Sequence, residues 1–313
     1  MEIKKTQAMF GSTNGLTDIR TLIWTPENPK AMLLIAPGVT DHMGRYDEFA
    51  RYMAGRGFLT FGCDPIGHGG SCTTMLQLGD FAEPDTDVRM VDDLHMLIRI
   101  MRRRQPDLPL FLLGHDMGAL LVRLHTVDFP DEASGVVLCS SPNAADILSR
   151  LEPFIDAVGG LIDTNMYTDR AGALFEKITA RILGDSDETA WLARSEQARE
   201  QADLDPYFGY PITYGSVLTL AKLLLRSASD GWFSRYPKAL PTLIIGGGRD
   251  PVTGMGRAVL QLCDRLENAG CAPETRLYPG MRHDLLREDD RRVVYEDIAD
   301  FLDACLMRKG ADA

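Results

Sequence analysis

Apolar residues run unbroken through short stretches that recur along the chain, separated by polar loops or helical patterns. Runs of this length are typical of strands buried on both faces of a parallel sheet. The stretches that predict such strands are residues 31–36, 58–63, 110–113, 136–141 and 241–248, with a further strand at 274–278. Residues 7–25 predict a hairpin, because Asn14-Gly15 is a favoured tight turn between its two strand-like runs.

Between these strands, apolar residues recur at helical spacing. Residues 86–104 show this most clearly, and Val88, Val91 and Leu94 lie on one helical face. Other helices are predicted at 45–56, 119–125, 256–268 and 290–307. Buried strands that alternate with amphipathic helices predict an α/β fold, with a mostly parallel, twisted sheet and helices on both faces. Ligands in such folds bind beyond the carboxyl ends of the strands.

The pattern changes between residues 142 and 237. Unbroken apolar strands vanish there, helical patterns dominate, and aromatic residues gather. This segment predicts a helical cap inserted into the sheet domain. The expected organisation is a core formed by residues 1–141 and 238–313, with residues 142–237 as the cap.

The strand at 110–113 leads into Gly114-His115-Asp116-Met117-Gly118 and then into a predicted helix. A strand, a tight turn and a helix in this order are the context of a nucleophile elbow. Small residues two before and two after the central residue let the chain turn sharply and expose that residue at the end of the sheet. Asp116 occupies the central position, where most examples of this motif carry serine. Taken alone, Asp116 also fits a helix N-cap.

Two further loops follow predicted strands and carry candidate catalytic groups. Asp250 follows the strand at 241–248, and His283 follows the last strand. The order nucleophile, acid, base is the order expected of an elbow-containing hydrolase. A histidine within hydrogen-bond reach of the reacting group needs a carboxylate to hold its tautomer. Taken singly, Asp250 fits a turn and His283 fits a packing or surface histidine.

Backbone amides are the expected donors of an oxyanion hole in this arrangement. Met117 follows Asp116 at a predicted helix N-terminus, where the helix dipole favours negative charge. The second donor is expected from the loop after the strand at 31–36, at Val39. An ordinary turn is the alternative interpretation of that loop.

The length, the net charge and the spacing of the cysteines argue against several other classes of protein. The chain has 313 residues and a net charge of −12, which argues against nucleic acid or an anionic membrane as a partner. No apolar run approaches the roughly 20 residues that span a bilayer. No apolar stretch follows the lysines of residues 1–6, so a secretory signal is not expected. The six cysteines lack Cys-x-x-Cys pairs, which favours reduced thiols in a cytoplasmic protein.

No cofactor motif and no His/Cys/Asp/Glu cluster with metal-ligand spacing is present. His68 and His115 are expected to be structural, and His42, His95 and His125 are assigned no role.

Several segments together resemble one family, the monoacylglycerol lipase, lysophospholipase and serine aminopeptidase-like group of α/β-hydrolases. Residues 37–42 (Pro-Gly-Val-Thr-Asp-His) resemble its His-Gly-x-x-Glu-His opening, and residues 64–71 resemble its Asp-x-x-Gly-His-Gly-x-Ser loop. The segments at 250–252 and 283–286 match its acid and base loops, and 191–194 and 205–213 resemble the cap of bacterial members. The resemblance implies an α/β-hydrolase with Val39 and Met117 as oxyanion donors, Asp250 as acid and His283 as base. It also implies that a cap shapes a pocket for a small apolar or acyl substrate.

The sequence departs from this group at two positions, where Asp116 replaces the serine and Pro37 replaces the oxyanion-loop histidine. A carboxylate that attacks an ester forms a poorly favoured anhydride, whereas attack on a saturated carbon opens an epoxide or expels a halide. Aspartate at the elbow also resembles epoxide hydrolases and haloalkane dehalogenases of this fold. His283 would then activate the water that hydrolyses the alkyl ester on Asp116.

Leaving-group assistance is expected from the aromatic residues of the cap. The candidate acids for epoxide opening are Tyr167, Tyr207, Tyr210 and Tyr214, and the weaker candidates for holding a halide are Trp191 and Trp232. Packing is the alternative role for each. Three functions therefore stay open: hydrolysis of an apolar substrate as in the lipase-like group, an Asp-nucleophile epoxide hydrolase or dehalogenase, and a non-catalytic ligand-binding member or inactivated serine hydrolase. The oligomeric state is unknown.

Overall fold

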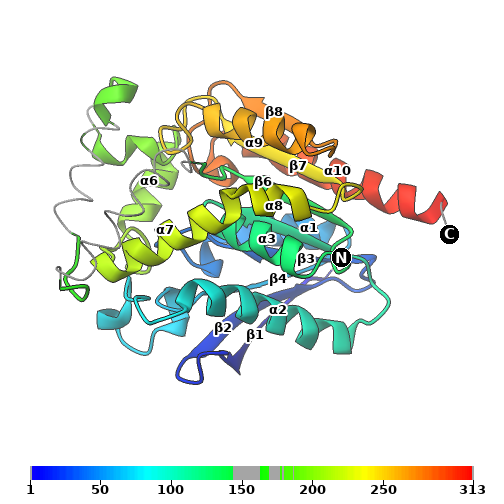
Figure 1. The fold of residues 1–313 in the computed structure, drawn as a ribbon, viewed down its shortest axis with the longest axis horizontal. Helices are drawn as coiled ribbons and strands as arrows, with labels where there is room; N and C mark the ends of the chain where they lie inside the picture. The colour runs from blue at the N-terminus through cyan, green and yellow to red at the C-terminus, as the bar shows by residue number, and fades with distance from the viewer. Residues whose placement is uncertain (1, 144–162, 169–176, 178–179, 186, 312–313) are drawn as a thin grey trace.

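Eight strands form a single sheet in the order β1-β2-β4-β3-β5-β6-β7-β8 (Figure 1). The computed structural model describes residues 2–143, 163–168, 177, 180–185 and 187–311. The β1–β2 and β2–β4 pairs are antiparallel, and all other neighbours are parallel. The strands are β1 (Lys4–Gly11), β2 (Asp18–Thr25), β3 (Ala31–Ala36), β4 (Phe58–Cys63), β5 (Leu110–His115), β6 (Gly135–Cys139), β7 (Thr242–Gly247) and β8 (Glu274–Tyr278). This is the α/β-hydrolase fold, as predicted.

Helices cover both faces of the sheet, because the central strands are apolar on both sides. Every residue of β3, β4, β5, β6 and β7 is buried. One core joins the sheet to α2, α3 and α9, and the other joins it to α1 and α10. These helices are α1 (Asp47–Gly55), α2 (Thr86–Arg104), α3 (Met117–Asp128), α9 (Arg257–Asn268) and α10 (Arg291–Ala311).

The predicted cap, residues 142–237, contains helices joined by loops in the parts that the structure describes. It contains the 3-10 helix η4 (Glu188–Trp191) and the helices α6 (Glu196–Asp203), α7 (Tyr214–Ala228) and α8 (Asp230–Arg235). In Figure 1, α6 lies beyond the left edge of the sheet. Leu223 of α7 and Trp232 of α8 are fully buried in the core shared with α3, so these two helices pack directly on the sheet domain. Residues 144–162, 169–176, 178–179 and 186 lie outside the described part, and the domain boundaries stay predictions.

The hairpin at the N-terminus is confirmed, but its connection is longer than a two-residue turn. The β1–β2 pairing ends at Gly11 opposite Asp18. Between them the Asn14 side chain accepts hydrogen bonds from the amides of Leu16 and Thr17, and the loop is anchored to α2 by Asp93. The asparagine therefore organises a wider loop. Within the described residues, no helix combines the length and apolarity needed to cross a membrane.

Candidate active site

Asp116 lies at a sharp turn between β5, which ends at His115, and α3, which begins at Met117. Its backbone has φ 51° and ψ −118°, a conformation that costs a non-glycine residue about 1–3 kcal/mol. The two flanking glycines permit this turn. A Cβ atom at Gly118 would collide with the carbonyl oxygen of Ala36, and one at Gly114 would collide with the backbone of Gly118 and Ala119. The strand, turn and helix predicted around Asp116 are therefore present.

The two oxygens of the Asp116 carboxylate have different surroundings. Oδ2 accepts a hydrogen bond of 3.0 Å from the amide of Val39, and Oδ1 lies 4.0 Å from Nε2 of His283. The side chain is almost fully buried, with 10% of its area exposed. The Val39 amide thus binds an oxygen of Asp116 itself, and its part in an oxyanion hole stays a prediction. Met117 is the first residue of α3, and its part in an oxyanion hole stays a prediction.

The side chains of Asp250 and His283 contact each other next to Asp116, although they come from different loops. Nδ1 of His283 lies 3.1 Å from Oδ2 of Asp250. Asp250 is fully buried and also accepts hydrogen bonds from the Val252 amide and the Thr253 hydroxyl. This arrangement directs a proton on Nδ1 toward Asp250 and leaves Nε2 facing Asp116. The structure brings the three predicted catalytic side chains together.

Two carboxylates set the charge of His283. Burial alone lowers the pKa of this imidazole, but the negative charges of Asp250 and Asp116 outweigh burial and raise the pKa to about 9. We therefore expect His283 to be protonated at neutral pH.

This charge state can be tested by NMR titration of histidine-labelled protein. We expect His283 to stay protonated up to about pH 9, and Asp116→Asn to lower its pKa by removing one negative charge. Because the folded-state pKa lies above the unfolded value of roughly 6.5, the stabilisation by His283 is complete below that pH. It is lost as the pH rises toward 9. An imidazole that is neutral at pH 7 in the unaltered protein would contradict this charge assignment.

A hydrogen-bonded network that the sequence did not reveal holds the loop of His283. Nδ1 of His115 lies 3.0 Å from the Tyr46 hydroxyl, which donates to Asp41, and Nε2 lies 3.3 Å from the carbonyl oxygen of His283. Ser140 donates to that same carbonyl. Burial and the nearby charge of His283 lower the pKa of His115, so it remains neutral. His115 is thus structural, as expected.

Ion pairs add a second anchor for the same loop. Asp284 follows His283 and pairs with Arg45 and with Arg287. Arg45 also pairs with Asp41 and stacks on Phe208. Asp41 and Asp284 belong to motif segments, but their pairing through Arg45 joins residues that are distant in sequence and could not be predicted from either segment.

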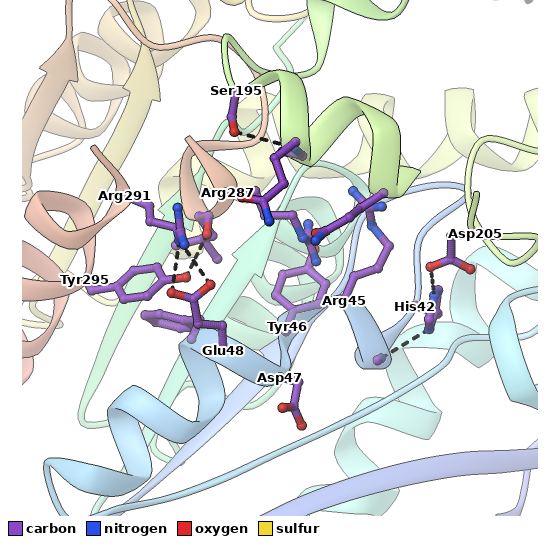
Figure 2. A pocket seen from close by; sticks show the side chains of 16 residues that line it. His42, Arg45, Tyr46, Asp47, Glu48, Ser195, Asp205, Arg287, Arg291 and Tyr295 are labelled. Atoms are coloured by element: carbon purple, nitrogen blue, oxygen red, sulfur yellow. Dashed lines mark hydrogen bonds and ion pairs between the residues drawn. The ribbon is translucent and has the colours of Figure 1, made fainter. Parts of the chain in front are cut away.

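A cavity of about 480 Å³ lies on the outer side of this network, between α1 and α6 (Figure 2). Figure 2 shows Arg45, Tyr46 and Arg287 gathered along it, with Arg291 paired to Glu48. None of the three predicted catalytic side chains lines this cavity. A smaller cavity of about 200 Å³ is lined by Trp191, and Trp191 is also next to the site.

Among the aromatic candidates of the predicted cap, Trp191 contacts His283 directly. Its ring lies 5.4 Å from the ring of His283, and its carbonyl oxygen accepts from the His283 amide. The tyrosines make other contacts. Tyr210 packs against His68 and donates to Gly67, Tyr167 donates to Leu76, Tyr207 packs against His42, and Tyr214 begins α7. Their roles toward a substrate stay predictions.

Trp232 is not available to a substrate, so its proposed halide contact is wrong. The side chain is fully buried, its indole N–H donates to the carbonyl oxygen of Arg123, and the Arg123 guanidinium lies over its ring. From the sequence, the aromatic residues between 142 and 237 are expected to line the substrate pocket. The ring of Trp232 instead fills the core beneath α8.

Comparison with known proteins places the chain in a family. The model of the family described as "Serine aminopeptidase, S33" (Hydrolase_4) matches residues 27–290. The chain belongs to this family of hydrolases. It is 29% identical to the "Monoglyceride lipase homolog" of monkeypox virus, covering 91% of this chain and 92% of the relative. It is 26% identical to the "Monoacylglycerol lipase" of Mycolicibacterium smegmatis, covering 90% and 91% of the two chains.

Solved structures support the same fold for this hydrolase. A carboxyl esterase from Bacillus coagulans, in complex with glycerol, has a TM-score of 0.89 at 24% identity and covers 97% of this chain and 100% of its own. A monoglyceride lipase from Saccharomyces cerevisiae has a TM-score of 0.72 at 15% identity, with 97% and 96% coverage. The predicted resemblance is confirmed: the protein is a monoglyceride lipase-like α/β-hydrolase.

Proposed function

We propose that this hydrolase cleaves an apolar substrate through an ester intermediate on Asp116, by attacking a saturated carbon such as that of an epoxide or an alkyl halide. One observation carries the proposal. The Val39 amide holds Oδ2 of Asp116, and Oδ1 lies next to His283 with no hydrogen bond to it at 4.0 Å. The carboxylate is therefore oriented with one oxygen in the oxyanion position and the other available as the nucleophile.

In the first step, an electron pair of Oδ1 forms a bond to the substrate carbon. The carbon–oxygen bond of an epoxide or the carbon–halogen bond breaks, and its electron pair leaves with the oxygen or the halide. A halide needs no proton, whereas the alkoxide from an epoxide takes one from a hydroxyl of the predicted tyrosine set. The product of this step is an alkyl ester whose carbonyl oxygen is Oδ2, still bound by Val39.

In the second step, Nε2 of His283 removes a proton from water, and the water oxygen attacks the ester carbon of Asp116. Negative charge develops on Oδ2, where the Val39 amide stabilises it. The intermediate collapses as the bond between the carboxyl carbon and Oδ1 breaks, and the alkoxide of the product takes the proton from His283. The new carboxyl group of Asp116 then loses its proton, to the tyrosinate in the epoxide route or to solvent in the halide route, which restores the carboxylate. Asp250 holds the imidazole and compensates the charge that it gains.

The charge of Asp116 couples the two steps. The resting pKa of His283, about 9, depends on the negative charges of Asp250 and Asp116. Esterification neutralises Asp116, so the pKa of His283 falls, the imidazolium releases its Nε2 proton to solvent, and the neutral imidazole becomes available as a base. The base is thus released when the ester that it must hydrolyse has formed.

Cleavage of a carboxylic ester is the second candidate, and the names of the relatives favour it. Two relatives that match about nine-tenths of this chain are named as a monoglyceride lipase homolog and a monoacylglycerol lipase. In that reaction the carbonyl oxygen of the substrate ester needs a hydrogen bond from the Val39 amide. Oδ2 of Asp116 already accepts that hydrogen bond. This competition is the reason to rank a saturated carbon first.

A single-turnover reaction in water labelled with oxygen-18 separates these routes. With enzyme in excess over an epoxide or haloalkane, we expect the label in the peptide that contains Asp116, because water attacks its carboxyl carbon. The Asp116→Asn variant should incorporate none. Label found only in the product would contradict an ester on Asp116, and turnover of monoacylglycerols in place of both other classes would favour the second candidate.

A further inference from the structure

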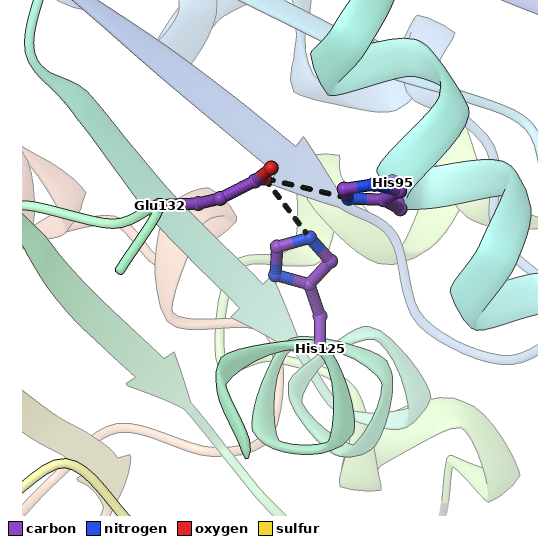
Figure 3. A group of neighbouring side chains, drawn as sticks. All are labelled: His95, His125 and Glu132. Atoms are coloured by element: carbon purple, nitrogen blue, oxygen red, sulfur yellow. Dashed lines mark ion pairs between the residues drawn. The ribbon is translucent and has the colours of Figure 1, made fainter. Parts of the chain in front are cut away.

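Three side chains with metal-binding atoms meet on the α2/α3 side of the molecule (Figure 3). His95 comes from the middle of α2, His125 from the last turn of α3, and Glu132 from the loop that leads to β6. Nδ1 of His95 lies 3.4 Å from Oε2 of Glu132, and Nε2 of His125 lies 3.6 Å from the same oxygen. One ligand atom from each residue lies within 4.8 Å of the other two. The sequence predicted no cluster with metal-ligand spacing, and the fold assembles one.

The ligand atoms of these side chains are buried without the hydrogen bonds that buried polar atoms normally make. Nδ1 of His95, both ring nitrogens of His125 and Oε2 of Glu132 have no hydrogen-bond partner among the described residues. The two separations exceed the 2.7–3.2 Å typical of an N–H···O hydrogen bond, at about 3.4 Å or more. Orphaned atoms from three elements that converge on one point need a physical explanation.

The separations match the spacing of ligands around zinc. Zinc binds histidine nitrogen and carboxylate oxygen at about 2.0–2.2 Å, so two ligand atoms of a tetrahedral site lie about 3.4 Å apart. Both measured separations to Oε2 of Glu132 are close to this value. The ligand atoms of the two imidazoles lie within 4.8 Å of each other, and the partly exposed His95 side chain can bring them to tetrahedral spacing by shifting within the plane of its stack on Phe129.

We propose that His95, His125 and Glu132 bind one Zn²⁺ ion, with water as the fourth ligand. Two neutral imidazoles and a carboxylate are a donor set that zinc accepts readily. His125 is fully buried, while 20% of the His95 side chain and 29% of the Glu132 side chain are exposed. The ion therefore enters from the surface side, where a water ligand also has room.

Neighbouring contacts hold the ligands in place. The ring of His95 stacks flat on Phe129, with 3.6 Å between the ring centres. Arg102 donates to the carbonyl oxygen of Glu132 and so ties the loop to α2. The side chains need little rearrangement to accept the ion.

The proposed ion has a structural role that is independent of the reaction at Asp116. His125 follows Asp116 by nine positions, so the site is about 14 Å along α3 from the elbow. The ion joins α2, α3 and the start of β6. It should stabilise the fold and leave the chemistry of the substrate unchanged.

The test uses the full chain without a polyhistidine tag, stripped of metal by chelation and dialysis. We expect one Zn²⁺ per chain by elemental analysis after addition and removal of excess metal. Co²⁺ as the probe should give the intense visible absorption of tetrahedral coordination. At a Zn²⁺ concentration about 100-fold above the dissociation constant, Tm should rise by about 4 °C.

Two variants and two controls identify the ligands. Glu132→Gln and His95→Gln should weaken Zn²⁺ binding at least about 10-fold, as ligand losses do, and abolish the rise in Tm. His42→Gln removes a similar, partly exposed histidine–carboxylate pair, with Asp205, and should bind Zn²⁺ normally. Circular dichroism of the metal-free variants checks that they fold. The proposal is overturned if no stoichiometric metal binds, if both ligand variants bind normally, or if His283→Gln is the variant that loses the ion.

Discussion

Asp116→Ser is expected to give this hydrolase an esterase activity at least about 100-fold above that of the unaltered chain. A serine at the elbow would place its hydroxyl where Oδ1 now faces Nε2 of His283. Removal of the carboxylate also frees the Val39 amide, which can then bind the oxygen of a substrate carbonyl. Because the pKa of His283 falls when the charge of Asp116 is removed, the imidazole becomes a base at neutral pH.

The measurement compares short-chain and long-chain esters with epoxides and haloalkanes for both proteins. Asp116→Asn is the matched control, since amide and carboxylate have nearly the same shape. It should lose turnover of epoxides or haloalkanes by on the order of 1,000-fold or more, without gaining esterase activity. A folded Asp116→Ser protein with no esterase activity would contradict the predicted oxyanion role of Val39. Rapid ester cleavage by the unaltered chain would contradict the saturated-carbon proposal.

The central strands could be predicted from sequence because burial on both faces leaves an unbroken apolar signal. The boundaries were less accurate where the backbone turns. The strand at 136–141 ends at Cys139, because Ser140 adopts φ 46° and donates its hydroxyl to the carbonyl oxygen of His283. The helix after the elbow begins at Met117, directly after Asp116, whereas its apolar pattern starts later.

The convergence of Asp116, Asp250 and His283 was predictable because each follows a strand, and the ends of parallel strands share one edge of the sheet. The supporting contacts were not. Tyr46 meets His115, and Arg45 meets Asp284, through pairs that are distant in sequence and have no periodic signal. The same reason hid the cluster of His95, His125 and Glu132, which depends on how α2 packs against α3.

His283→Gln is expected to stop the reaction at the ester on Asp116. The first step needs no base, and the Val39 amide that orients the Asp116 carboxylate is unchanged in this variant. The second step needs a base at Nε2, and an amide side chain cannot accept the proton of water. Intact-protein mass spectrometry should show the mass of the alkyl group added once per chain, while steady-state turnover falls by on the order of 1,000-fold or more.

Two comparisons make this result specific to the proposed route. The double variant Asp116→Asn, His283→Gln should form no adduct, which places the alkyl group on Asp116. Asp250→Asn should form the adduct and hydrolyse it slowly, because it leaves a base but loses the carboxylate that holds it. A folded His283→Gln protein that turns over normally would show that this imidazole is not the base. One that is inactive and never acquires an adduct would mean that His283 acts before any bond to Asp116 forms, as it does for a serine nucleophile.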